Sequence, residues 1–146
     1  MRTFRWYALA WFCIFALRGM LPAAAAEPLA LHERAAVRAV IEDQLAAFAN
    51  DDAERAFSHA SPTIQETFVT ARNFMDMVRI SYPVVYRPAS LRFQVPFSQE
   101  GAVWQVVAMR DAAGTDWTAV YTLLRQGDGA WRINGCVLQR GLGASI

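Results

Sequence analysis

The spacing of apolar residues changes from a helical period to a strand period partway along this chain, and this change constrains the fold more than any other feature. In residues 31–49 the apolar side chains fall on one stripe of a helix: Val37, Val40, Ile41, Leu45 and Phe48. From residue 91, in "SLRFQVPF", apolar and polar residues alternate as in a half-buried strand. Helices first and strands afterwards predict an α+β fold, with the helices on one face of a bent sheet.

Shorter helices are predicted after residue 50. Asn50 suits a left-handed turn, and Asp51 or Asp52 can cap a helix over residues 53–60. Ser61, followed by a proline, has the residue type and setting of a further N-cap.

A last helix is predicted over residues 70–80. Its methionine-rich stripe is typical of a core face, or of an adaptable binding surface. Pro83 disfavours helical geometry at Tyr82, so this helix must end there. Tyr82 and Tyr86 would then lie on one side of an extended segment, either as plugs at the end of the core or at the rim of a pocket.

The remaining sequence predicts an antiparallel sheet of about four strands. Pro96 has no N–H to donate, so it places an edge or a bulge in the first strand. Residues 102–111, "AVWQVVAMRD", are apolar on both faces, which is expected of a central strand covered on two sides. The turns "SQEGA", "AAGT" and "QGDG" are of hairpin length, so consecutive strands run antiparallel.

The first 26 residues have the pattern of a signal peptide. Arg2 and Arg5 precede an apolar run over residues 6–17, and "PAAAA" supplies the small residues that a signal peptidase needs. The apolar run is shorter than the roughly 20 residues of a membrane-spanning helix, although an uncleaved anchor is the competing interpretation. Cleavage after Ala26 would leave one domain, residues 27–146, in the periplasm or outside the cell, with no stable membrane insertion.

Charge and cysteine content exclude several classes of function. Three of the 14 basic residues lie in the leader, so residues 27–146 carry 11 arginines and 13 acidic residues, a formal charge of −2. This balance disfavours nucleic acid and anionic membranes as partners. Cys136 is the one cysteine after the leader, and is predicted to be a small buried thiol on a strand or, alternatively, a redox-sensitive thiol or one that forms an intermolecular disulfide. With only His32 and His59 beside it, no metal site is predicted, and no cofactor motif is found.

Two groups of motifs carry a family resemblance. "AAFANDDAERAF" and "GDGAWRINGCVL" resemble the opening helices and the closing hairpin of the nuclear transport factor 2-like superfamily. "SPTIQETF", "FMDMVRISYPVVYRP" and "AVYTLLRQGDGAWRINGCVL" resemble more closely an uncharacterised bacterial family, the domain of unknown function 4864. The resemblance spans residues 31–140 and implies a cone-shaped α+β fold enclosing a pocket. It implies no particular activity, because the superfamily contains enzymes and inert accessory domains.

The catalytic patterns of the superfamily are only partly matched. Its steroid isomerases carry a tyrosine on the first helix, where this chain has only apolar residues on the inward stripe. Its dehydratases pair a histidine with an aspartate among tyrosines. General acid–base work in the cone would need a buried acid or imidazole, and if the chain is an enzyme the candidate catalytic residues are His59 and Asp76, with Tyr82, Tyr86 and Tyr121 as further candidates.

The sequence leaves two hypotheses for function. The first is an exported module that binds a small apolar ligand, or serves as an accessory domain, without catalysis of its own. Its candidate ligand-binding residues are Tyr82, Tyr86 and Tyr121. The alternative is a small lyase or isomerase that acts on an apolar substrate in the cone. A homodimer built through the sheet is compatible with either hypothesis.

Overall fold

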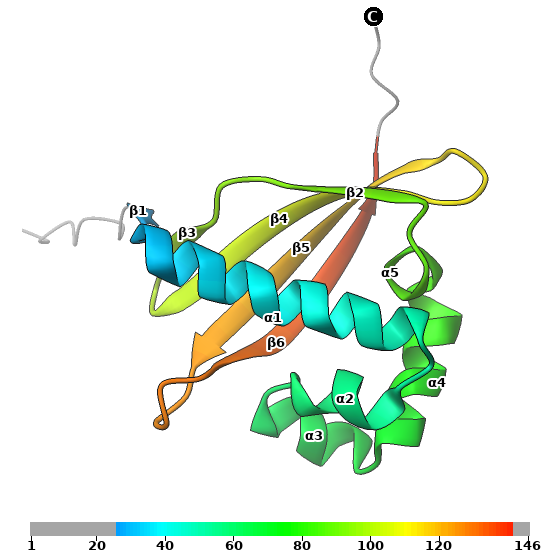
Figure 1. The fold of residues 1–146 in the computed structure, drawn as a ribbon, viewed down its shortest axis with the longest axis horizontal. Helices are drawn as coiled ribbons and strands as arrows, with labels where there is room; N and C mark the ends of the chain where they lie inside the picture. The colour runs from blue at the N-terminus through cyan, green and yellow to red at the C-terminus, as the bar shows by residue number, and fades with distance from the viewer. Residues whose placement is uncertain (1–25, 142–146) are drawn as a thin grey trace, which may run out of the picture.

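The computed structural model describes residues 26–141, and the predicted signal peptide lies outside this range except for Ala26. The helices are α1 (Leu31–Ala49), α2 (Ala53–Ser58), α3 (Pro62–Phe68), α4 (Ala71–Ser81) and α5 (Pro83–Tyr86). The strands are β1 (Glu27–Pro28), β2 (Ser90–Phe93), β3 (Phe97–Gln99), β4 (Ala102–Arg110), β5 (Asp116–Arg125) and β6 (Trp131–Arg140). Helices therefore precede all but the shortest strand, and the α+β prediction is confirmed (Figure 1).

The predicted caps define the helix boundaries. Asp52 accepts a hydrogen bond from the backbone N–H of Arg55 at 3.1 Å and opens α2. Ser61 accepts from the N–H of Ile64 at 3.4 Å and opens α3. The left-handed residue between α1 and α2 is Asp51, with φ 56°, so the prediction of Asn50 for this place is wrong.

The strands form one antiparallel sheet in the order β1-β3-β4-β5-β6, with β2 pairing β4 beside β3. The sheet has six strands, where the sequence predicted about four. The predicted first strand is split into β2 and β3, because the ladder is interrupted before Pro96. The two-residue β1 adds a further edge by pairing with β3.

All five helices lie on one side of the curved sheet, with α1 running across it (Figure 1). The core lies between these two layers and contains fully buried side chains of both, such as Val37 and Ile41 of α1 and Val107 and Leu123 of the sheet. Among the described residues, the other face of the sheet has no helix over it. Strand β4 is therefore not covered on both sides as predicted, and Trp104 on the open face is only half-buried.

Two local predictions near the joint between helices and sheet are also wrong. Residues 83–86 are not extended: Pro83 opens the single helical turn α5, where a proline needs no N–H of its own. Leu91 and Val95 are not buried by the strand alternation, since their side chains are 39% and 67% exposed. Both lie near the interrupted edge of the sheet, where the regular alternation of faces does not continue.

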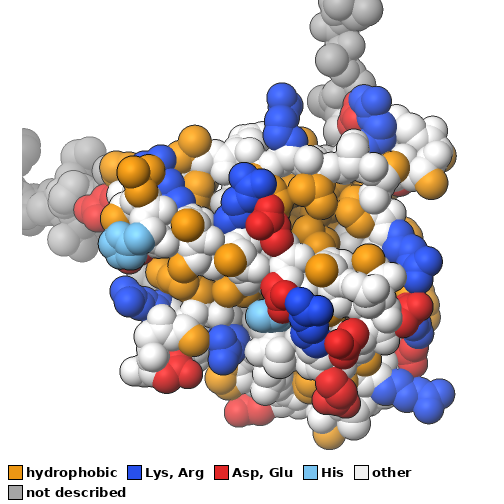
Figure 2. Space-filling view, in the orientation of Figure 1, with side chains coloured by type: hydrophobic (Ala, Val, Ile, Leu, Met, Phe, Trp, Pro, Cys, Tyr) orange, Lys and Arg blue, Asp and Glu red, His pale blue; other side chains and the backbone are white. Residues whose placement is uncertain are grey.

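Charged side chains of both signs are interspersed over the helical face (Figure 2). Several form ion pairs, including Arg38 with Glu42 at 2.8 Å and Arg79 with Asp51 at 2.9 Å. No helix in the range 26–141 combines the length and the apolar character needed to cross a membrane.

Candidate functional site

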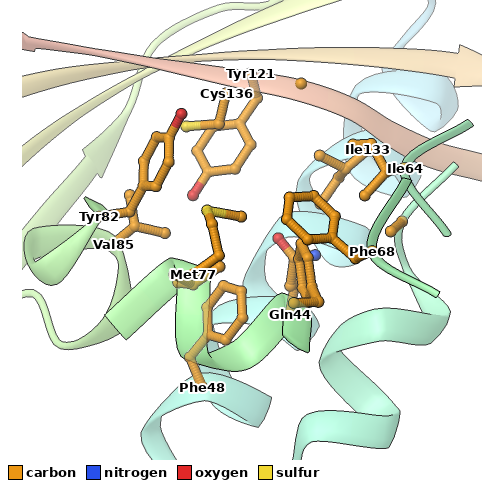
Figure 3. A pocket seen from close by; sticks show the side chains of 14 residues that line it. Gln44, Phe48, Ile64, Phe68, Met77, Tyr82, Val85, Tyr121, Ile133 and Cys136 are labelled. Carbon is orange, nitrogen blue, oxygen red and sulfur yellow. The ribbon is translucent and has the colours of Figure 1, made fainter. Parts of the chain in front are cut away.

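A pocket of about 250 Å³ lies between the helices and the inner face of the sheet (Figure 3). It is lined by 14 residues, none of them charged, from α1, α3, α4, α5, β5, β6 and the segments that join α2 to α3 and α4 to α5. The volume exceeds that of the roughly 150 Å³ apolar cavity that is known to admit benzene. The pocket can therefore hold a small, mainly apolar molecule.

The helical side of the pocket is built from aromatic and aliphatic side chains. Phe74 of α4 lies at the centre of an aromatic cluster, with ring centroids 6.0 Å from Phe48, 5.4 Å from Phe57 and 5.6 Å from Phe68. Met77 of α4 also lines the pocket, and its flexible thioether can adapt to different shapes. Within the methionine stripe, Met75 is buried in the core, whereas Met77 lines the pocket.

Tyr121 provides a polar group on the sheet side. Its side chain is 1% exposed, and its hydroxyl has no hydrogen-bond partner among the described residues. Figure 3 shows this hydroxyl pointing away from the sheet, toward Met77. Burial raises the pKa of the Tyr121 phenol well above its usual value, so the group stays neutral and keeps its proton to donate.

Gln44 provides the polar group on the helical side, and its side-chain amide is fixed in one orientation. Its Nε2 donates to the backbone oxygen of Ala56 at 3.0 Å, which requires the nitrogen to face α2. The amide oxygen therefore points in the opposite direction, toward Met77 (Figure 3), and is available there as an acceptor.

Cys136 lines the pocket beside Tyr121, across the β5–β6 ladder from it. Cys136 is of intermediate exposure as a residue and packs against the hydrophobic core from strand β6. Its apolar surroundings raise the pKa of the thiol to about 12.

The structure separates the three tyrosines that the sequence grouped as ligand-binding candidates. Tyr82 and Tyr121 line the pocket, but Tyr86 does not. The Tyr86 hydroxyl instead donates to the Asp51 carboxylate on the surface, and accepts from Arg79 at 3.2 Å. Tyr82 and Tyr86 are thus directed to different places, because α5 is a helical turn and not an extended segment.

The two candidate catalytic residues are not brought together, and neither lines the pocket. His59 Nε2 lies 2.5 Å from Asp43 Oδ2, and Arg55 also donates to this carboxylate. The bonds from Arg55 and then His59 lower the pKa of Asp43 to about 2. Asp76 lies on the surface of α4, 3.4 Å from Arg79.

Sequence reasoning missed Gln44 and the contribution of α3 to the pocket. Gln44 carries a detectable signal, because it is a polar residue between Ile41, Leu45 and Phe48 on the buried stripe of α1. The half-buried Ile64 and Phe68 of α3 carry none, since only the tertiary structure places this short helix against β6. In the described part of the chain, no three His, Cys, Asp or Glu side chains are placed to hold a metal ion.

Comparison with known proteins identifies the chain at the level of a family. Residues 30–146 match the family described as "Domain of unknown function (DUF4864)". The chain belongs to this family. Its fold is similar to the crystal structure of an NTF-2-like protein of unknown function from Silicibacter pomeroyi DSS-3, with 18% sequence identity and a TM-score of 0.53 over 77% of this chain and 100% of that chain. No curated protein matches this chain in sequence.

The family assignment and the fold agree with the resemblance that the sequence motifs carried. The family is described as one of unknown function, and the similar structure is of an NTF-2-like protein of unknown function. The chain therefore shares its overall architecture with that structure.

Proposed function

We propose that this domain binds a small, mainly apolar molecule in the pocket and performs no chemistry of its own. The observation that carries this proposal is an apolar space of about 250 Å³ between the helices and the sheet, with no charged side chain in its lining. Burial of a ligand there would remove apolar surface from water on both sides, which favours binding.

The alternative, a lyase or isomerase acting on an apolar substrate, has less support. General acid–base catalysis needs a group that can exchange a proton within hydrogen-bond reach of the substrate. The carboxylate of Asp76 and the imidazole of His59 both lie outside the pocket lining. Tyr121 and Cys136 do line it, but the raised pKa of each makes it a poor base near neutral pH.

Binding can be tested with 1-fluoronaphthalene, a neutral apolar probe, by ¹⁹F NMR and calorimetry. Ile64 is half-buried and lines the pocket from α3, so Ile64→Trp should fill part of the space and weaken binding at least tenfold. Thr63→Trp is the matched control, because Thr63 is the preceding, exposed residue of the same helix. Equal binding by both variants, or no binding to the unmodified protein, would contradict the proposal.

We further propose that the domain acts after export, in the periplasm or outside the cell. The support is the signal-peptide pattern of the first 26 residues. The position of β1 is compatible with cleavage after Ala26, because β1 begins at Glu27, which pairs with Ser98 of β3.

A second copy of the chain is proposed as the partner of the open sheet face. Val106, Val120 and Val137 are neighbours across β4, β5 and β6 on this face, and Val137 is 57% exposed. In a homodimer formed through this face, the valine side chains would be removed from water, which favours association. Val137→Glu should reduce the mass measured by light scattering from that of a dimer to that of a monomer. Thr63→Glu, at an exposed position of α3 on the helical side of the sheet, should leave the mass unchanged.

A further inference from the structure

The unpartnered hydroxyl of Tyr121 restricts what the pocket can bind. A buried hydroxyl without a hydrogen bond is unfavourable, and such groups are rare in folded proteins. The Tyr121 hydroxyl is nearly inaccessible to solvent and has no partner in the described part of the chain. It is also directed away from the sheet and toward Met77, a pocket-lining residue (Figure 3). An acceptor atom on a bound molecule would satisfy it.

The neighbouring side chains cannot supply this acceptor without leaving their positions. Gln44 is held by its bond to Ala56, and Met77 and Cys136 offer only sulfur, which is a weak acceptor. Tyr82 also lines the pocket, but its hydroxyl makes no hydrogen bond to that of Tyr121 in the described structure. The donor is thus available to a ligand.

The absence of charge in the lining sets the second restriction. None of the 14 lining residues is Asp, Glu, Lys, Arg or His. A charged ligand group in this space would lose its hydration without gaining a partner of opposite charge, which is strongly unfavourable. The acceptor must therefore belong to a neutral group.

We propose that the pocket takes a small, neutral, mainly apolar molecule with a carbonyl oxygen, and that this oxygen accepts a hydrogen bond from the Tyr121 hydroxyl. Ketones, aldehydes, lactones and neutral esters have this chemistry, whereas free fatty acids and amines do not. The inference rests on the proposed function and adds to it the polar group that distinguishes the ligand from a hydrocarbon. Tyr121 acts here as a binding residue.

A pair of probes tests this assignment: 1-tetralone, and 1-methylidenetetralin, in which a CH₂ group replaces the carbonyl oxygen. Their dissociation constants are measured by calorimetry for the unmodified protein and for Tyr121→Phe, which removes only the hydroxyl. The variant should bind the ketone roughly three- to tenfold more weakly, which is the change in affinity expected from the loss of one hydrogen bond. The hydrocarbon should bind the variant as well as the unmodified protein, or better. Tyr86→Phe is the matched control and should change neither affinity, because Tyr86 lies outside the pocket.

A second readout needs no variant. The carbonyl stretch of bound 1-tetralone should lie at lower frequency than in hexane, because a hydrogen bond weakens the C=O bond. An unshifted carbonyl band would overturn the assignment, and so would a ketone affinity that Tyr121→Phe leaves unchanged. In either case, binding of 1-fluoronaphthalene would still support the proposed function. Binding of 1-fluoronaphthalene without binding of 1-tetralone would also overturn it. If none of the three probes binds, both the inference and the proposed function fail.

Discussion

The Tyr86 hydroxyl donates to the carboxylate of Asp51, which lies 35 residues earlier in the chain. This contact joins the end of α5 to the turn between α1 and α2. Arg79 and Arg87 bind the same carboxylate, at 2.9 Å and 3.1 Å. The bond from Tyr86, followed by that from Arg79, lowers the pKa of Asp51 below its usual value.

The first prediction concerns this contact and its dependence on pH. Asp51→Asn should lower the melting temperature at pH 7, because it removes the negative charge while keeping a residue type that tolerates the φ of 56°. Asp51 has a lowered pKa in the folded state, so its contribution to stability is present above the unfolded pKa of about 4 and is lost as pH falls through the folded value. The difference between variant and unmodified protein should therefore shrink below about pH 4.

Thermal unfolding followed by circular dichroism between pH 2 and pH 8 measures this difference. Glu66→Gln, at an exposed carboxylate on α3, is the control and should show a smaller effect at pH 7. A melting-temperature difference that stays constant over the whole pH range would show that the Asp51 charge is not what holds α5 in place.

The second prediction is that Tyr121→Phe does not destabilise the protein. The hydroxyl has no partner among the described residues, so its removal should leave the free energy of unfolding unchanged or raise it by about 1 kcal/mol. Tyr121→Ala, in contrast, should cost about 3–5 kcal/mol because it deletes a fully buried ring. Urea unfolding of the two variants checks both values. A loss of more than about 1 kcal/mol in Tyr121→Phe would mean that the hydroxyl is hydrogen-bonded in the folded protein.

The third prediction concerns the reactivity of Cys136. A thiol with a pKa of about 12 is ionised to roughly one part in ten thousand at pH 8, so N-ethylmaleimide should label it far more slowly than free cysteine. The rate should rise about tenfold for each pH unit up to the pKa, and a bound pocket ligand should slow it further. Mass spectrometry follows the labelling, and the same protein in urea is the control. Rapid labelling of the folded protein at pH 8 would support a redox-sensitive thiol.

The fourth prediction is that His59 and Asp76 have no part in the pocket. His59→Gln and Asp76→Asn should leave the affinity for 1-fluoronaphthalene unchanged, because neither side chain lines the pocket. Calorimetry measures this directly, with Ile64→Trp as the variant that should lose binding. Turnover of an enolisable ketone that either substitution abolishes would restore the catalytic hypothesis.

The fifth prediction is the start of the mature protein. Sequencing of the N-terminus of protein from its native host should find Glu27 as the first residue, because the small residues before it form a signal-peptidase site. Full-length protein recovered from the inner membrane would support an uncleaved anchor instead.

The sequence by itself determined the features that depend on neighbours along the chain. Helix α1 spans the residues that its apolar period predicted, since helical hydrogen bonds join residues four apart. Asp52 and Ser61 cap the helices that follow them, and Pro83 ends α4, because these effects act within a single turn. The order of helices and hairpins along the chain fixed the fold class, because it can be read without knowing which distant residues meet.

The tertiary structure decided which side chains meet. Strands β1 and β3 have only 2 and 3 residues, too few to show a period of two, and exist because neighbouring strands supply their hydrogen bonds. Tyr86 turned away from the pocket because Asp51 and Arg79 bind its hydroxyl, while Tyr121 faces the pocket because it lies on the inner side of β5. These outcomes depend on contacts between residues far apart in the chain, and local propensity does not encode them.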